Sequence, residues 1–199
     1  MQGLVCRAME LFVTASRGGA VWSRIAARAG LAELAAAPVE PFLPMPADAP
    51  DRLLRAARAE LQRPAAALLE DMGTHLVTHP ACERVRRLLR FGGADYADFL
   101  HSLQDLPARA ALALPDLVLP AITVDEAQAG RFAITVAPGL PGFGPVAAGM
   151  MRAMADDYGA LVLLRLRAGR GGACRIGVEL ADTGHAAPRG FALAVTGTA

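Results

Sequence analysis

Apolar residues recur at helical spacing through the first half of the chain. This spacing predicts six helices, over residues 3–16, 21–29, 53–61, 64–80, 85–91 and 96–106. Glycine pairs follow the first and fifth of these segments, where they can end a helix. Five prolines between positions 35 and 50 predict a loop in that stretch.

The pattern changes after Pro115, where short runs typical of strands begin. Two runs, 121–125 and 131–137, flank a turn at 129–130, and two more, 160–167 and 173–180, flank a glycine-rich turn. Between the pairs, Pro145 opens a helix with four apolar residues along one side: Val146, Met150, Met151 and Met154. The expected fold class is therefore α+β, a helical N-terminal part followed by a small antiparallel sheet, laid out as a meander, with an inserted helix.

Length and composition favour a single domain. The chain has 199 residues, of which 54% are hydrophobic, enough for a substantial core. We expect this domain to span residues 1–182, with the helical part at about 1–113 and the sheet-containing part at about 114–182. Residues 183–199 are rich in glycine and alanine and are expected to form a C-terminal tail.

Charge and hydropathy narrow the possible partners. The net charge is +1, with acids and bases spread along the chain, so we expect no nucleic-acid partner. Arginine supplies all 20 basic residues, which excludes lysine-based chemistry. No apolar run reaches membrane-spanning length, and Arg7 and Glu10 interrupt the region where a signal peptide would be apolar. We expect a cytoplasmic protein with no membrane partner.

The reactive residue types form no recognisable catalytic pattern. Cys6, Cys82 and Cys174 are odd in number and include no CxxC pair, so free thiols are expected. No Ser-His-Asp arrangement, paired-carboxylate motif or HExxH motif is recognisable, and we expect no enzyme.

Histidines are the weak candidates for metal binding. His75 and His79 are four residues apart and would share a helix face, but no third ligand is evident nearby. His101 is expected at the surface or rim.

Several segments, in order along the chain, carry a resemblance to a known family. They begin with Met1-Gln2-Gly3-Leu4-Val5 and Gly19-Ala20-Val21-Trp22, and continue with Leu68-Leu69-Glu70-Asp71-Met72-Gly73, Phe99-Leu100-His101-Ser102-Leu103-Gln104-Asp105-Leu106, Leu114-Pro115-Asp116-Leu117 and Gly149. Together they resemble the haem-nitric-oxide/oxygen-binding (H-NOX) family, like the haem domain of soluble guanylate cyclase, in its stand-alone bacterial type. The resemblance implies the H-NOX fold, a b-type haem (heme) between the two parts, and sensing of nitric oxide or oxygen.

The two haem-holding signatures of that family are altered here. The iron-binding histidine falls on Pro107, and the Tyr-x-Ser-x-Arg motif that binds the propionates falls on Val136, Pro138 and Leu140. Proline has no side-chain donor atom for iron, and it disturbs a helix interior. We therefore expect no conventional haem and a helix that restarts at Pro107, with Asp105 as its N-cap.

The resemblance also assigns pocket positions. They are Val5, Met9, Leu76, Leu103, Leu106, Pro107, Pro120, Val136, Pro138, Leu140 and Val146. Such a lining suits a packed core or an apolar small ligand. The expected function is a non-catalytic sensory or regulatory domain that signals through a protein partner, such as a histidine kinase or a cyclic-nucleotide enzyme. The alternative is a genuine haem gas sensor with a non-standard or absent axial ligand.

Overall fold

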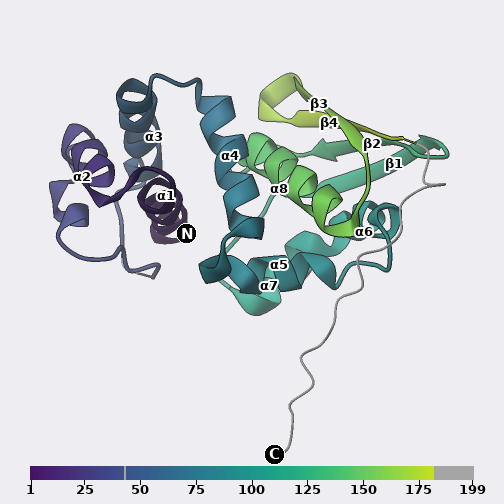
Figure 1. The fold of residues 1–199 in the computed structure, drawn as a ribbon, viewed down its shortest axis with the longest axis horizontal. Helices are drawn as coiled ribbons and strands as arrows, with labels where there is room; N and C mark the ends of the chain where they lie inside the picture. The colour runs from purple at the N-terminus through teal and green to yellow at the C-terminus, as the bar shows by residue number, and fades with distance from the viewer. Residues whose placement is uncertain (43, 182–199) are drawn as a thin grey trace, which may run out of the picture.

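The computed structural model describes residues 1–42 and 44–181, and its first part is a group of packed helices (Figure 1). This group contains α1 (Gln2–Arg17), α2 (Gly19–Arg28), a short 3-10 turn (Ala32–Ala35) and α3 (Ala49–Leu61). The helix α3 begins four residues earlier than the sequence pattern indicated. Its first turn holds Pro50, whose missing N–H is not needed there.

Two polar contacts fix the 3-10 turn and the proline-rich loop against these helices. The Trp22 indole N–H donates to the Leu34 carbonyl at 3.0 Å. The Glu10 carboxylate is buried, accepts the Val39 backbone N–H at 2.9 Å and pairs with Arg7. A buried carboxylate requires such partners, so the Glu10 contacts stabilise the return of the loop toward α1.

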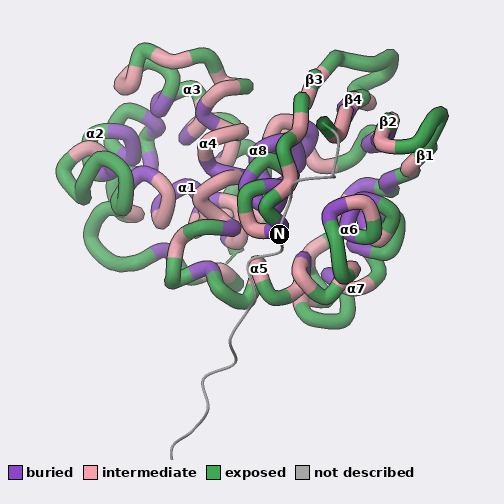
Figure 2. The backbone as a smooth tube through the Cα atoms, turned by 45° about the vertical axis from the view of Figure 1, so that its right-hand side comes forward, coloured by how far each residue is buried: buried purple, intermediate pink, exposed green. Residues whose placement is uncertain are grey.

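Four further helices lead to the sheet. They are α4 (Ala65–Thr78), α5 (Glu83–Arg90), α6 (Tyr96–Ser102) and α7 (Leu106–Ala113). Short 3-10 turns separate α4 from α5 (Pro80–Cys82) and α6 from α7 (Leu103–Asp105). Buried residues occur along both groups of helices (Figure 2).

Within the described residues, the sheet has four antiparallel strands in the order β1-β2-β4-β3. They are β1 (Ile122–Gln128), β2 (Arg131–Val136), β3 (Val162–Ala168) and β4 (Cys174–Leu180). The α+β class and the two hairpins are confirmed. The meander is wrong, because β4 lies between β2 and β3, with Ile134 opposite Ile176.

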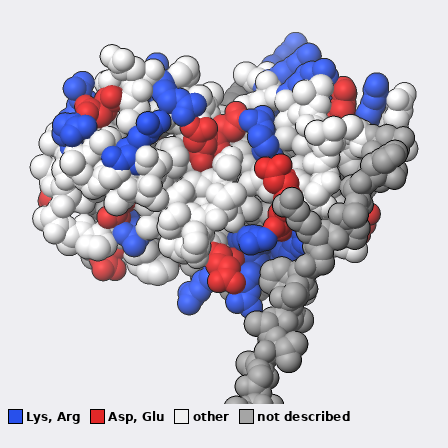
Figure 3. All heavy atoms as spheres, in the orientation of Figure 1, with Lys and Arg blue, Asp and Glu red and all other residues white. Residues whose placement is uncertain are grey.

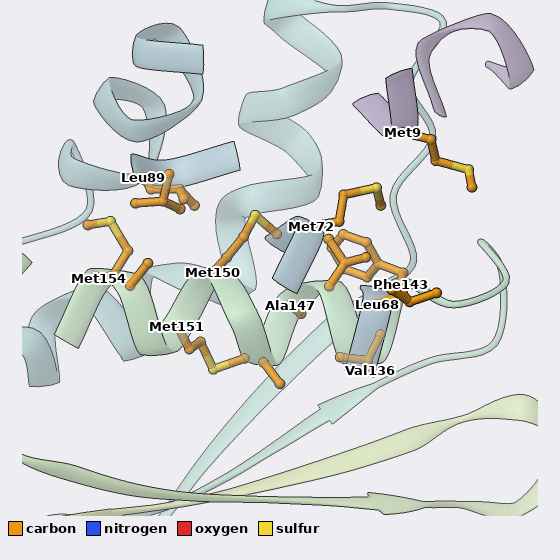
Figure 4. Close-up of a cluster of buried hydrophobic side chains, with 14 of the residues drawn as sticks. Met9, Leu68, Met72, Leu89, Val136, Phe143, Ala147, Met150, Met151 and Met154 are labelled. Carbon is orange, nitrogen blue, oxygen red and sulfur yellow. The ribbon is translucent and has the colours of Figure 1, made fainter. Parts of the chain in front are cut away.

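The long helix α8 (Phe143–Tyr158) lies between α4 and the sheet (Figure 1). Its methionines do not share one side as the sequence predicted. In Figure 4, Met150 points toward α4 while Met151 points toward the strands. The reason is the position of α8 in the middle layer, which buries it on both sides.

Helices α4 and α8 touch through their backbones. A Cβ on Gly73 would lie 2.0 Å from the Val146 carbonyl oxygen, and one on Gly149 would lie 1.9 Å from that of Glu70. Thr74 strengthens this junction, since its hydroxyl reaches the Gly149 carbonyl at 3.3 Å. Only glycine permits so close an approach.

Within the described ranges, no helix has the length and apolar character needed to cross a membrane. The predicted tail, 183–199, lies outside the described residues.

Candidate functional site

Pro107, at the position expected for an iron-binding histidine, lies in the first turn of a new helix. The helix α6 ends at Ser102, a 3-10 turn follows, and α7 starts at Leu106. The predicted restart is therefore confirmed. The Asp105 cap is wrong in one respect, because its side chain makes no capping hydrogen bond. Its backbone is helical, with φ −88° and ψ −8°, whereas a capping side chain needs an extended backbone.

The three positions of the propionate-binding motif lie at the end of β2 and in the loop that leads to α8. Val136 is buried, Pro138 is exposed and Leu140 is half-buried. The loop borders a hollow of about 360 Å³ that also contacts Phe143 and Cys174. None of these three side chains can donate a hydrogen bond to a carboxylate.

The other predicted pocket residues belong mostly to one hydrophobic core. The buried members of this core are Met9, Leu103, Leu106, Val136 and Val146. The partly buried residues that pack against it are Val5, Leu76 and Leu140. Pro120 is buried beside the loop at Gly139. Met9 also lines a cavity of only about 10 Å³ between α1, α3 and α4, room for about one water. That these residues line a single ligand pocket stays a prediction.

The donor set does not fit a haem held in the usual way. Haem needs an axial donor for iron and polar partners for its two propionates. Pro107 supplies no donor atom, and Val136, Pro138 and Leu140 supply no polar side-chain atom. An unpaired buried carboxylate costs several kcal/mol.

His101 does not replace the missing ligand. It lies at the surface, as predicted, with Nε2 at 3.1 Å from a Glu126 carboxylate oxygen. Its ring also meets the edge of Phe132 at a centroid distance of 5.3 Å. These contacts direct His101 toward β1 and β2.

His75 and His79, by contrast, lie beside a third potential ligand, Cys82, which the sequence pattern did not reveal. Ligand atoms of His75, His79 and Cys82 all lie within 4.8 Å of one another. The signal was the spacing of two histidines and a cysteine around Pro80, a residue that ends the helix and allows the chain to turn back.

Two arginines of α5 have a structural role. Arg86 and Arg90 both pair with Asp157 at the end of α8, and the Arg90 guanidinium lies 4.1 Å from the centre of the Tyr158 ring. The two arginines offset a negative charge that is unfavourable at a helix C-terminus. On the face drawn in Figure 3, basic and acidic groups lie among one another.

Comparison with solved structures gives the same fold at low sequence identity. An H-NOX protein from S. oneidensis in the Fe(II)NO ligation state is 15% identical, with a TM-score of 0.72 over 92% of this chain and 100% of the other. An unliganded Fe(II) H-NOX mutant from K. algicida is 16% identical, with a TM-score of 0.75 over 92% and 98%. An H-NOX mutant from T. tengcongensis is 10% identical, with a TM-score of 0.73 over 92% and 98%.

Sequence comparison identifies the family. A search of curated proteins gives no match. The family model described as haem-NO-binding matches residues 2–164, which is most of the chain. Family model and fold agree: this chain belongs to the haem-NO-binding, or H-NOX, family.

Proposed function

We propose that this chain is a non-catalytic regulatory domain of the haem-NO-binding family that lacks conventional haem ligation and signals through a protein partner. The observation that carries this proposal is Pro107 in the first turn of α7. Proline is favourable in the first turn of a helix and has no side-chain atom that could bind iron. The helix α7 therefore begins at this point without needing a bound metal.

The altered propionate motif supports the same conclusion independently. It lies on β2 and the following loop, far along the chain from Pro107. One loss removes a bond to the metal, and the other removes the partners of two carboxylates. A single compensating residue could not restore both.

The residues that line the hollow beside the loop after β2 favour an apolar small molecule as the ligand class. The hollow beside the loop has a volume of about 360 Å³ and is bordered by Val136, Leu140 and Phe143. Small-molecule sites commonly have volumes of about 300–1,000 Å³ and mainly apolar walls.

The family match favours a second candidate. Members of a haem-NO-binding family are expected to bind haem, so this chain could be a gas sensor with a non-standard or absent axial ligand. Both candidates predict a sensor domain, and they differ in whether haem is held.

Haem reconstitution separates the two. The purified chain is mixed with haem, passed through a desalting column and examined by absorption spectroscopy, with Pro107→Ala as a matched control. We expect no stoichiometric Soret band from either protein. A variant combining Pro107→His with Val136→Tyr, Pro138→Ser and Leu140→Arg is expected to retain haem. A stoichiometric Soret band from the unmodified chain, shifting with nitric oxide, would favour the second candidate.

The partner is tested in a separate assay. The purified chain is added to a histidine kinase, and autophosphorylation is followed over time, with a cyclic-nucleotide enzyme assayed in parallel. We expect the rate of one of these two enzymes to change in proportion to the fraction of that enzyme that has bound the added chain. Unchanged rates together with no measurable binding would contradict signalling through these partner classes.

A further inference from the structure

The C-terminal end of α4 gathers three residues whose side chains bind transition metals. His75 and His79 share one face of the helix, and their rings stack with a centroid distance of 4.5 Å. Cys82 is seven residues after His75, which on a straight helix would place it about 10 Å further along the axis. The turn at Pro80–Cys82 instead returns Cys82 to the histidines, so that all three ligand atoms lie within 4.8 Å.

We propose that His75, His79 and Cys82 bind one Zn²⁺ ion, with a fourth position left for water. Two imidazoles and one thiolate are a donor set that Zn²⁺ accepts in tetrahedral geometry. Tetrahedral zinc places its ligand atoms about 3.5 Å apart, so the three side chains need to close by about an ångström.

The His75 ring has an unmet requirement that a metal would satisfy. Its Nε2 atom is shielded from solvent and has no hydrogen-bond partner among the residues that the structure describes. The ring edge packs against Phe12 of α1, at a centroid distance of 5.8 Å. Burial, together with the nearby His79, lowers the pKa of His75, which favours the neutral imidazole that metals bind.

The other two ligands can adjust to a metal. His79 Nδ1 accepts the Ala81 backbone N–H at 3.2 Å, and because Ala81 is exposed, water can replace that acceptor. Burial raises the pKa of Cys82, and the Arg7 guanidinium acts in the opposite direction. Coordination itself deprotonates a thiol.

The position of the site gives it a structural consequence. It connects the end of α4 to the start of α5, and through Phe12 it contacts α1. Bound zinc would therefore hold the end of α4 in place relative to both neighbours. This proposal is independent of haem, since it uses none of the predicted haem-pocket residues.

Cobalt substitution tests the site. The untagged, full-length chain is stripped with a chelator and titrated with Co²⁺, then with Zn²⁺ in competition. We expect one Co²⁺ to bind per chain. Its visible absorption bands should have the high intensity of tetrahedral Co²⁺, and a thiolate-to-cobalt charge-transfer band should appear in the near ultraviolet. Cys82→Ser should abolish the charge-transfer band, and both it and His79→Gln should weaken Zn²⁺ binding by more than about 100-fold.

Matched variants complete the test. Cys174→Ser and His101→Gln change the same residue types elsewhere and should leave the spectrum and stoichiometry unchanged. Circular dichroism in chelator confirms that each variant folds, and His79→Gln retains the test if Cys82→Ser does not fold. Absence of stoichiometric metal in the unmodified chain would overturn the proposal. So would a Zn²⁺ affinity in Cys82→Ser and in His79→Gln equal to that of the unmodified chain.

Discussion

Gly149 of α8 lies so close to Glu70 of α4 that a Cβ on the glycine would stand 1.9 Å from the Glu70 carbonyl oxygen. The obstruction is backbone, which cannot rotate away as a side chain can. Gly149→Ala is therefore expected to lower the free energy of unfolding by about 2–3 kcal/mol, despite the better helix propensity of alanine. Urea denaturation followed by circular dichroism measures the change.

Gly19 provides the matched control for this substitution. It is also helical, but a Cβ there would meet nothing within 4 Å. Gly19→Ala should change stability by less than about 1 kcal/mol. Equal effects at the two glycines would contradict a tight α4–α8 junction.

Asp157 should contribute to stability through its two arginine partners. Its side chain is mostly buried, and both Arg86 and Arg90 pair with it. Asp157→Asn should cost about 1–2 kcal/mol, because Arg90 would remain partly buried beside Tyr158 without its counter-charge. Thermal unfolding at low and high salt measures the loss and its screening.

The neighbouring Asp156 serves as the comparison. It is exposed near the same helix end, where a negative charge is unfavourable. Asp156→Asn should therefore be neutral or slightly stabilising. A loss as large as that of Asp157→Asn would mean that the ion pairs are not the cause.

Alkaline pH should destabilise the fold through Cys6. Burial raises the pKa of this thiol from about 9 to about 11. Between these values the unfolded chain releases the proton while the folded chain keeps it, so stability falls as pH rises, by up to about 1.4 kcal/mol per pH unit. Urea unfolding from pH 8 to 11 should show a shallower decline for Cys6→Ala.

Tyr96 also lowers the stability of the fold at alkaline pH, so the test is the difference between the unmodified chain and Cys6→Ala. Burial also raises the pKa of its hydroxyl, which donates to the Met151 carbonyl at 3.0 Å. That effect operates above about pH 10 in both proteins and cancels in the difference. Parallel declines for the two proteins would exclude Cys6 as a cause.

Pro107→Ala should change stability only slightly. The proline occupies a first-turn position, where it restricts the unfolded chain without removing a helical hydrogen bond. We expect a loss of about 1 kcal/mol or less, measured by urea denaturation. A loss above about 3 kcal/mol would mean that the ring has a packing role beyond helix initiation.

The sequence predicted most elements because each depends on local signals. Apolar spacing located every long helix, and the glycine-rich turn located the β3–β4 hairpin. The restart at Pro107 followed from proline chemistry alone. These features need no knowledge of what lies across the fold.

Features that depend on distant residues were missed. The place of β4 between β2 and β3 depends on how α8 crosses the sheet, which periodicity does not encode. The burial of α8 on both sides, the Asp157 ion pairs and the approach of Cys82 to the histidines likewise depend on segments that meet only after folding.

The inner position of β4 also affects the order in which the chain can fold during synthesis. The family match ends at residue 164, yet β2 and β3 hydrogen-bond to β4 and not to each other. A nascent chain that has emerged only to that point lacks the strand that joins them. The sheet can close only after the ribosome has released residues 174–180, so any shortened version needs to retain them.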